Sequence, residues 1–132
     1  MIDKPKIALV GCGRISRNHI KAITLHYERA ELVALCDTEQ QRLDAAQELV
    51  SEATKEYPAA AHNPEQFIGY DNLLEAIKSS AIQVDLVVLT TPSGLHPAQT
   101  IAAAEIGVHV CTEKPMATRW EDGVAMVKAC DQ

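Results

Sequence analysis

Short apolar runs alternate with longer amphipathic runs along this 132-residue chain. Short runs rich in aliphatic and β-branched residues are typical of strands that are buried on both faces, whereas the longer runs have the periodicity of helices. Because a helix between two strands returns the chain across a sheet, this alternation produces parallel strands. We therefore predict an α/β fold, a doubly wound parallel sheet with helices on both faces.

The same patterns place the individual elements. Residue 107, a glycine, is free to take the left-handed conformation that ends many helices. The run 84–90 is almost wholly aliphatic, so we expect it to be a central strand. Residues 56–64 contain two prolines and no periodicity, which predicts a loop and the most mobile part of the chain. The predicted strands are residues 6–10, 31–36, 66–70, 84–90 and 108–112, and the predicted helices are residues 14–27, 38–55, 71–80, 97–107 and 118–130.

Three helix starts carry capping signals. Thr38 with Gln41, and Thr118 with Glu121, have the capping-box spacing, and Asp71 is the expected cap of the third helix. After the last helix, a six-stranded sheet would add one more strand beside strand five. We therefore expect an open edge there, and we expect residues 1–132 to be the first domain of a larger protein.

Composition excludes several classes of protein. The chain is 47% hydrophobic and 23% charged, which is typical of one globular domain. Its net charge is -6 and no lysine or arginine cluster is present, so we expect no nucleic-acid partner. The apolar runs are too short to cross a bilayer, so we expect no membrane partner. The N-terminal apolar run ends in glycines rather than at a signal cleavage site, which favours a cytoplasmic protein.

Four cysteines occur without a C-x-x-C pair, at positions 12, 36, 111 and 130. In a chain without a secretion signal they are predicted to be reduced thiols that pack as small hydrophobic residues. The alternative, a metal site, is the weaker interpretation, and we predict no metal.

A glycine loop follows the first predicted strand. The sequence ALVGCGRIS matches G-x-G-x-x-G at Gly11 and Gly13, with Ser16 in the third position. Gly11 allows a tight turn, Gly13 leaves room for a pyrophosphate, and the next helix offers its positive end to that anion. Asp37 ends strand two at about the twenty-residue spacing that the motif requires. These features predict a Rossmann-type dinucleotide site.

The acid at position 37 also bears on the choice of cofactor. Its carboxylate would accept hydrogen bonds from the adenosine ribose and would repel a 2′-phosphate. Thr38 stands where an arginine would favour NADP. We therefore predict NAD. The alternative is a glycine turn in an α/β protein that binds no nucleotide.

Two further motifs lie at the carboxyl ends of strands four and five, where ligands of open parallel sheets bind. They are TTPSGLHP, Thr90 to Pro97, and TEKP, Thr112 to Pro115. Together with the glycine loop and Asp37, they make the chain similar to the Gfo/Idh/MocA family of oxidoreductases, which act mostly on sugars and cyclitols. Residues 87–123 look most like the UDP-N-acetyl-glucosaminuronate 3-dehydrogenases of bacterial lipopolysaccharide biosynthesis.

The resemblance implies a role for each motif. The pyrophosphate would lie on the glycine loop, Asp37 would bind the adenosine ribose, and Glu113 and Lys114 would flank the nicotinamide. Lys114 would reach the substrate hydroxyl as the catalytic residue, with His96 as a second candidate. The implied cofactor-binding residues are Gly11, Gly13, Arg14, Ile15, Asp37, Thr91, Pro92, His96, Glu113 and Lys114.

Several of these roles have alternatives. His96 could instead cap the helix that follows it, and His19, which also recurs in the family, could serve only in packing. The commoner family pattern has asparagine where this chain has Ser93, so Ser93 is a weaker candidate. Pro115 is a candidate for a cis peptide bond after Lys114.

The implied reaction is hydride transfer between nicotinamide and a secondary alcohol of a sugar or sugar nucleotide. The implied alcohol is the one at C3 of a UDP-N-acetyl-hexosaminuronic acid. Lys114 would accept the hydroxyl proton if uncharged, or would stabilise the alkoxide if charged. In the family a second domain supplies most substrate contacts and forms the homo-oligomer, so we expect this chain to bind NAD without efficient turnover. The alternatives are a stand-alone NAD-binding sensor or partner-binding module and a methyltransferase, although a methyltransferase does not explain the EKP motif.

Overall fold

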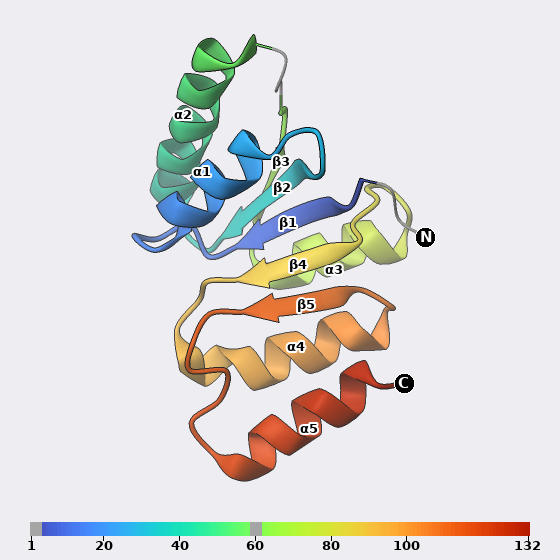
Figure 1. Cartoon of the computed structure of the whole chain (residues 1–132). Coiled ribbons are helices and arrows are strands. Elements are labelled where there is room, and N and C mark those ends of the chain that lie inside the picture. Colours follow the sequence, from blue (N-terminus) through green and yellow to red (C-terminus); the bar gives the residue numbers. More distant parts are fainter. Residues whose placement is uncertain (1–3, 59–61) are drawn as a thin grey trace.

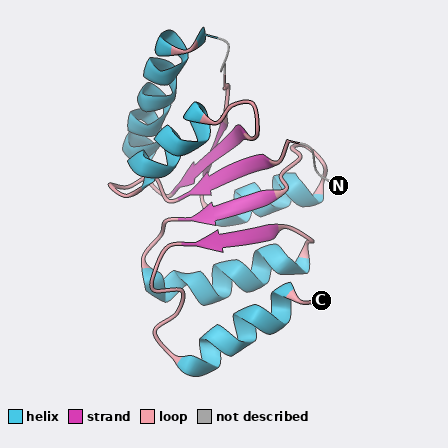
Figure 2. Ribbon diagram, in the orientation of Figure 1, coloured by secondary structure: helices cyan, strands magenta, loops and turns pink. Residues whose placement is uncertain are grey.

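The computed structural model describes residues 4–58 and 62–132, and its strands form a parallel sheet flanked by helices (Figures 1 and 2). In the described residues the sheet has five strands in the order β3-β2-β1-β4-β5, and each neighbouring pair is parallel. The predicted doubly wound Rossmann-type fold is confirmed. The strands are β1 (Lys6–Val10), β2 (Glu31–Asp37), β3 (Glu65–Ile68), β4 (Leu86–Leu89) and β5 (His109–Thr112).

The predicted helices are all present, within a few residues of their expected bounds. The first is shorter than predicted at both ends, and strand β4 begins two residues later than expected. A short 3-10 helix, η2, precedes the fourth α-helix. The helices are α1 (Ser16–Leu25), α2 (Gln40–Glu56), α3 (Tyr70–Lys78), η2 (Ser93–Leu95), α4 (His96–Glu105) and α5 (Trp120–Cys130).

Strand β1 is central and shows how the core is divided. Its side chains alternate between the two faces of the sheet, as in any strand. Ile7 and Leu9 pack in the cluster that contains buried residues of α1 and α2, whereas Ala8 and Val10 pack in the cluster that contains buried residues of α3 and α4. The helices therefore cover both faces, and the sheet between them holds its carboxyl ends at one edge. Strand β4 lies inside the sheet, between β1 and β5, as its aliphatic sequence predicted.

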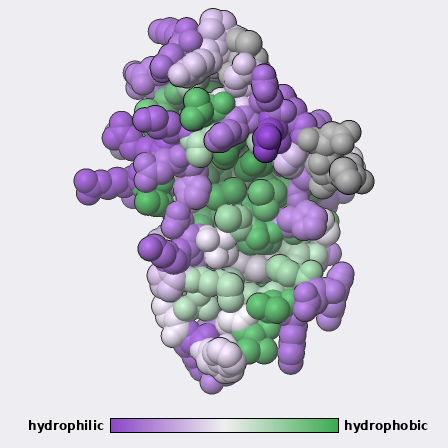
Figure 3. Space-filling view, in the orientation of Figure 1, coloured by the Kyte–Doolittle hydropathy of each residue, from purple (hydrophilic) through white to green (hydrophobic). Residues whose placement is uncertain are grey.

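Strand β5 is the edge of the described sheet, and α5 packs beyond it against α4 (Figure 1). Two apolar residues of α5 are exposed, Trp120 at 82% and Val127 at 52%, beside the exposed charges of Glu121 and Lys128. Figure 3 shows hydrophobic atoms at the surface in the middle of the view and again near the C-terminal helix. The expected open edge beside strand five is thus present in the described sheet.

The predicted side-chain caps are wrong. Helices α2, α3 and α5 begin after Glu39, Gly69 and Arg119, and none of these starts has a side-chain cap hydrogen bond. At α2 the Asp37 carboxylate accepts the N–H of Glu39 at 3.0 Å, so this carboxylate is the side chain that meets the start of the helix rather than the Thr38 hydroxyl. Asp71 lies inside the first turn of α3, where its charge faces the positive end of that helix.

Two other expectations concern turns and loops. Gly107 has φ +79°, which confirms the predicted left-handed end of the fourth helix. Residue 56, placed at the start of the predicted loop, is instead the last residue of α2. Residues 59–61 of that loop lie outside the described residues, and its mobility stays a prediction. Among the helices of the described ranges, none has the length and hydrophobicity needed to cross a membrane.

Candidate cofactor and active site

The carboxyl ends of β1, β4 and β5 meet at one edge of the sheet, toward which the arrowheads in Figure 1 point. A groove of about 480 Å³ lies here, lined by residues that follow β1, β2 and β4. Five of the predicted cofactor-binding residues line this groove. They are Gly11, Gly13, Asp37, Thr91 and Pro92.

Gly11 brings the loop after β1 against the end of β4. Its φ is +91°, and a Cβ atom built on it would lie 2.8 Å from the backbone carbon of Thr90 and 2.9 Å from the nitrogen of Thr91. The Thr90 hydroxyl donates a hydrogen bond to the carbonyl of Val10 at 3.0 Å and contacts that of Gly11. Any side chain at position 11 would therefore push two strand ends apart.

Gly13 is free of such contacts and faces open space. No atom lies within 4 Å of the position that its Cβ would occupy. The hydroxyl of Ser16 donates to the Gly13 carbonyl at 2.5 Å, which fixes the loop against the start of α1. No acidic residue lies in the first turn of α1, so its positive end is not neutralised. The loop therefore fits a pyrophosphate group.

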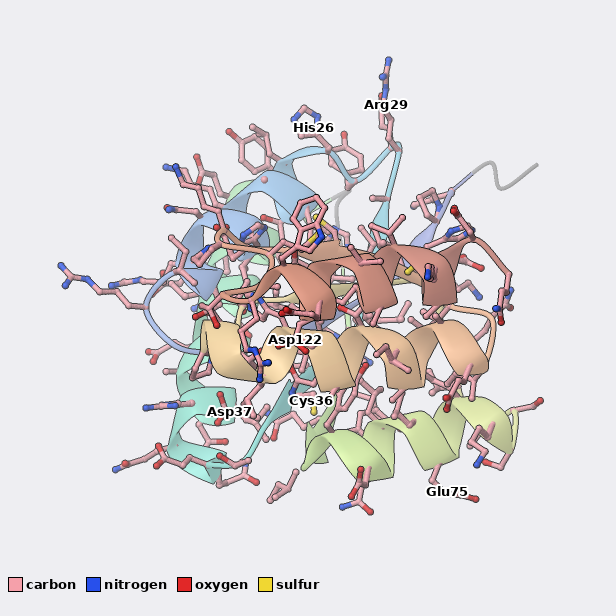
Figure 4. The ribbon with its side chains drawn as sticks, turned by 90° about the horizontal axis from the view of Figure 1, so that it is seen from below. His26, Arg29, Cys36, Asp37, Glu75 and Asp122 are labelled. Atoms are coloured by element: carbon pink, nitrogen blue, oxygen red, sulfur yellow. The ribbon has the colours of Figure 1, made fainter. Side chains whose placement is uncertain are left out.

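Asp37 joins two elements around the groove and is only 7% exposed. One carboxylate oxygen accepts the Cys12 N–H at 2.8 Å, and the other accepts the Glu39 N–H. Figure 4 shows this residue beside α2. Each carboxylate oxygen has a second lone pair, so ribose hydroxyls can still donate to it. Arg42, which the sequence analysis missed, lines the groove with Nη1 4.0 Å from Asp37 Oδ1.

Tyr70 and Gln99 complete the wall opposite the glycine loop, and both were missed. The hydroxyl of Thr91 donates to the Gln99 side chain at 2.6 Å, and the hydroxyl of Tyr70 donates to the Gln99 carbonyl at 2.7 Å. Burial raises the pKa of Tyr70, so its hydroxyl stays protonated and is a hydrogen-bond donor. Tyr70 follows the carboxyl end of β3. Because ligands of open parallel sheets bind at the carboxyl ends of the strands, this position was a signal that could have identified Tyr70.

His96 lies beneath the groove and is 1% exposed. Its Nε2 is 2.9 Å from the Thr91 carbonyl, and its Nδ1 is 3.1 Å from the Pro115 carbonyl. The ring therefore connects the loop after β4 with the loop after β5. His96 is the first residue of α4 and Leu95 is at the N-cap position, so the alternative that His96 caps this helix is wrong.

Glu113 and Lys114 follow β5, next to the end of β4. The N–H of Glu113 donates to the Leu89 carbonyl at 3.0 Å, which continues the ladder between these strands. Its carboxylate is 2.6 Å from His19 Nε2, and this hydrogen bond lowers the pKa of Glu113. Lys114 is exposed and does not line the groove. The peptide bond between Lys114 and Pro115 is cis.

The remaining predicted residues lie around the glycine loop. Arg14 and Ile15 are exposed and adjoin the first turn of α1. Ser93 belongs to η2, one turn before His96. Cys12 and Cys36 are buried, and burial raises the pKa of each thiol to about 12. They are protonated thiols at neutral pH.

A family model matches residues 5–132 of the chain, and it describes an oxidoreductase family with an NAD-binding Rossmann fold, Gfo/Idh/MocA. The chain belongs to this family. The Gfo/Idh/MocA domain described here therefore has NAD as its cofactor, and the geometry of Gly11, Gly13 and Asp37 fits that dinucleotide.

Solved and curated relatives agree with this assignment. The WlbA dehydrogenase from Bordetella pertussis, whose crystal structure contains NADH and UDP-GlcNAcA, is 48% identical with a TM-score of 0.80, over 99% of this chain and 34% of that one. The scyllo-inositol dehydrogenase from Lactobacillus casei, with bound NAD(H) and scyllo-inositol, is 27% identical with a TM-score of 0.74, over 98% and 33%. The D-apiose dehydrogenase of Paraburkholderia graminis is 36% identical over 99% of this chain and 30% of its own length.

This chain thus spans about a third of the length of the relatives that it matches. Two of their crystal structures contain UDP-GlcNAcA or scyllo-inositol, and the third relative is named a D-apiose dehydrogenase. Membership of the family is therefore compatible with several sugar-like substrates.

Proposed function

We propose that this domain binds NAD in the groove and holds it for hydride transfer with a secondary alcohol of a sugar or sugar nucleotide. The observation that carries the proposal is the placement of the glycine loop, Asp37 and Lys114 along one edge of the sheet. Asp37 ends β2 and Lys114 follows β5, so a dinucleotide bound at Asp37 and the glycine loop would extend toward the lysine. This orientation puts the reacting end at β4 and β5.

Lys114 has the catalytic role in this proposal. Bound NAD supplies the acceptor for the hydride that leaves the carbon of the alcohol. Nζ of Lys114 takes the hydroxyl proton if the amine is uncharged, or donates a hydrogen bond to the developing alkoxide if it is charged. The loop that contains Lys114 is held by Glu113 in the β4 ladder and by the contact between Pro115 and His96. His96 stays a predicted site residue, and its geometry supports holding this loop.

The finer proposal concerns the substrate. We propose oxidation at C3 of a UDP-N-acetyl-hexosaminuronic acid, as in bacterial lipopolysaccharide biosynthesis. The 48% identity to a dehydrogenase crystallised with UDP-GlcNAcA supports it, since the cyclitol enzyme described above is only 27% identical.

We also propose a cytoplasmic location. The cysteines of the described residues are free, and two are exposed, which supports a reducing compartment.

We also propose that the domain is the N-terminal part of a two-domain enzyme, which assembles as a homo-oligomer. The length of the relatives supports this arrangement, because the chain covers only 34% of the B. pertussis dehydrogenase. The competing proposal is a stand-alone NAD-binding module without catalysis. The EKP motif and its contacts with His19 and Leu89 favour the enzyme.

Calorimetry with NAD and NADP, on the unaltered chain and on Asp37→Ala, tests cofactor binding. We expect the unaltered chain to prefer NAD and Asp37→Ala to lose most of that preference, because the carboxylate is the group that would accept the ribose hydroxyls and repel a 2′-phosphate. Asp44→Ala, a change of an exposed carboxylate on α2, is the control. A folded chain that binds no NAD would refute the proposal, and tighter binding of NADP would refute the role of Asp37.

Turnover separates the enzyme from the binding module. We expect the 132-residue chain to show little oxidation of UDP-GlcNAcA, and we expect a protein that also carries a second domain of this family to oxidise it. Lys114→Met in the longer protein should abolish oxidation of UDP-GlcNAcA, while NAD should still bind. Robust oxidation by the short chain would contradict the need for a second domain.

A further inference from the structure

We propose that His19 is a positioning residue that holds the Glu113 carboxylate at the end of β5, toward which the nicotinamide half of NAD bound in the groove would extend. The inference rests on the proposed function, because it needs a bound dinucleotide. It assigns a task to a residue of α1 that the glycine motif does not include. The group that the Glu113 carboxylate would bind is a ribose hydroxyl of the cofactor.

The contact joins two elements that are far apart in sequence. His19 Nε2 and Glu113 Oε1 are 2.6 Å apart, and the two side chains are 27% and 28% exposed. Hydrogen bonds of this length between imidazole and carboxylate are charge-assisted and strongly directional. The contact therefore fixes the orientation of a carboxylate at the surface of the site.

Glu113 is restrained from two sides. Its N–H donates to the Leu89 carbonyl at 3.0 Å, so its backbone continues the ladder between β4 and β5. Its carboxylate is restrained by the contact with His19. A carboxylate offers about four lone-pair sites, so capacity remains for a ligand hydroxyl.

A packing role does not account for His19. The next residue, Ile20, is 1% exposed and belongs to the core cluster under α1, whereas the His19 ring reaches away from that cluster to the end of β5. A histidine that served only the core would be enclosed by it. His19 instead is partly exposed and ends on the residue beside Lys114.

The order of the strands places this contact at the nicotinamide end. Asp37 ends β2, the glycine loop follows β1, and Glu113 follows β5, at the opposite side of β4. A dinucleotide that extends from Asp37 across the loop therefore meets Glu113 with its nicotinamide half. Loss of the His19 contact should weaken recognition of that half and leave the adenosine half unchanged.

The test compares three ligands, NAD, ADP-ribose and ADP, by calorimetry on the 132-residue chain. We expect His19→Leu to weaken NAD and ADP-ribose about fivefold or more, the effect of losing one oriented hydrogen bond to a charged group, and to change ADP less than about twofold. His19→Gln, whose amide can still donate to Glu113, should restore most of the loss. His26→Leu is the matched control, since His26 is exposed at the end of α1, away from Asp37 (Figure 4).

The outcomes are distinct. If His19→Leu loses affinity equally for all three ligands, or loses none for NAD, the role of His19 is overturned. NAD binding by the unaltered chain would still support the proposed function. No binding of NAD by the unaltered chain would overturn both. If His19→Leu does not fold, Glu113→Gln gives the same test, because it keeps the shape of the side chain and removes the charge. It should show the same difference between NAD and ADP.

Discussion

Gly11 and Gly13 stand two residues apart in one loop and lack side chains for different reasons. Gly11 has a positive φ, and a Cβ there would lie 2.8 Å from the backbone of Thr90. Gly13 has no atom within 4 Å of its absent Cβ, because it borders the groove. Position 11 is therefore restricted by the fold, whereas we propose that position 13 is restricted by the pyrophosphate of NAD.

Alanine at each position should separate these restrictions. Gly11→Ala should lower the free energy of unfolding by about 2 kcal/mol or more, through a strained backbone and a backbone clash. Gly13→Ala should change it by less than about 1 kcal/mol, yet weaken NAD binding about tenfold or more, because the methyl group occupies the pyrophosphate space. Urea unfolding followed by circular dichroism and calorimetry measure the two effects. Equal destabilisation by both changes would contradict this division.

His96 gives a second prediction at the scale of single residues. Its two ring nitrogens lie 2.9 and 3.1 Å from the carbonyls of Thr91 and Pro115, and the ring is 1% exposed. Each tautomer of the imidazole donates from one nitrogen, so leucine would fill the space but leave at least one of these carbonyls without its donor, and His96→Leu should cost about 1–3 kcal/mol of unfolding free energy. His96→Gln should cost less, since its amide can donate to one of them.

His109→Leu, a change of an exposed histidine on β5, is the control for this measurement. If His96→Leu and His109→Leu have the same unfolding midpoint in urea, the connection between the two loops does not stabilise the domain. If only His96→Leu is destabilised, the ring holds the loop of Lys114 in place.

At the scale of elements, the sequence predicted the strands and helices but not how the helices begin. Strands are visible because their aliphatic runs are buried on both faces, as at Val87 on one face of β4 and Val88 on the other. Helix starts depend on which polar group is near in space. The Asp37 carboxylate reaches the N–H groups of Cys12 and Glu39, and a local capping-box pattern at Thr38 does not show this.

His62 joins the segment before β3 to the start of β2 and gives a prediction for pH. Its Nδ1 accepts the Leu32 N–H at 3.0 Å, and its side chain is buried. Burial, together with the charge of Lys4, lowers the pKa of His62 below the ordinary value of 6.5. Below pH 6.5 the unfolded chain therefore binds a proton that the folded chain refuses, and stability falls as the pH falls.

His62→Asn removes the titration and keeps an acceptor for the Leu32 N–H. We expect the unaltered chain to lose stability from pH 7 to pH 5 more steeply than His62→Asn, because only the unaltered chain has an imidazole whose pKa is lowered on folding. His26→Asn, at an exposed position, should follow the unaltered chain. Parallel pH profiles for the unaltered chain and His62→Asn would show that His62 does not cause the loss.

At the scale of the whole molecule, the site is assembled by topology. Contacts such as His19 with Glu113, which are 94 residues apart, have no local sequence signal. Arg42 lies on α2, which carries many exposed polar residues, and Gln99 lies on α4 outside the TTPSGLHP motif, so nothing marks either residue beforehand. The motifs identified the ends of the strands, and the order of the strands supplied the rest.

The groove is built from the segments that follow β1, β2 and β4, so bound NAD should stabilise these three segments together. In hydrogen exchange we expect NAD to slow exchange in residues 11–16, 37–42 and 90–99, which line the groove or adjoin it. We expect little change in residues 120–130, since α5 lies beyond α4 and does not line the groove. Stronger protection of α5 than of the glycine loop would show that NAD binds elsewhere.

The exposed side chain at the start of α5 has a consequence for spectroscopy. Trp120 is the only tryptophan of the chain, and it is 82% exposed. Its fluorescence already comes from an aqueous environment in the folded protein, so emission will change little on unfolding and is a poor probe of stability. The same property makes it a built-in optical reporter of docking, because any surface that covers α5 will shift its emission toward the blue.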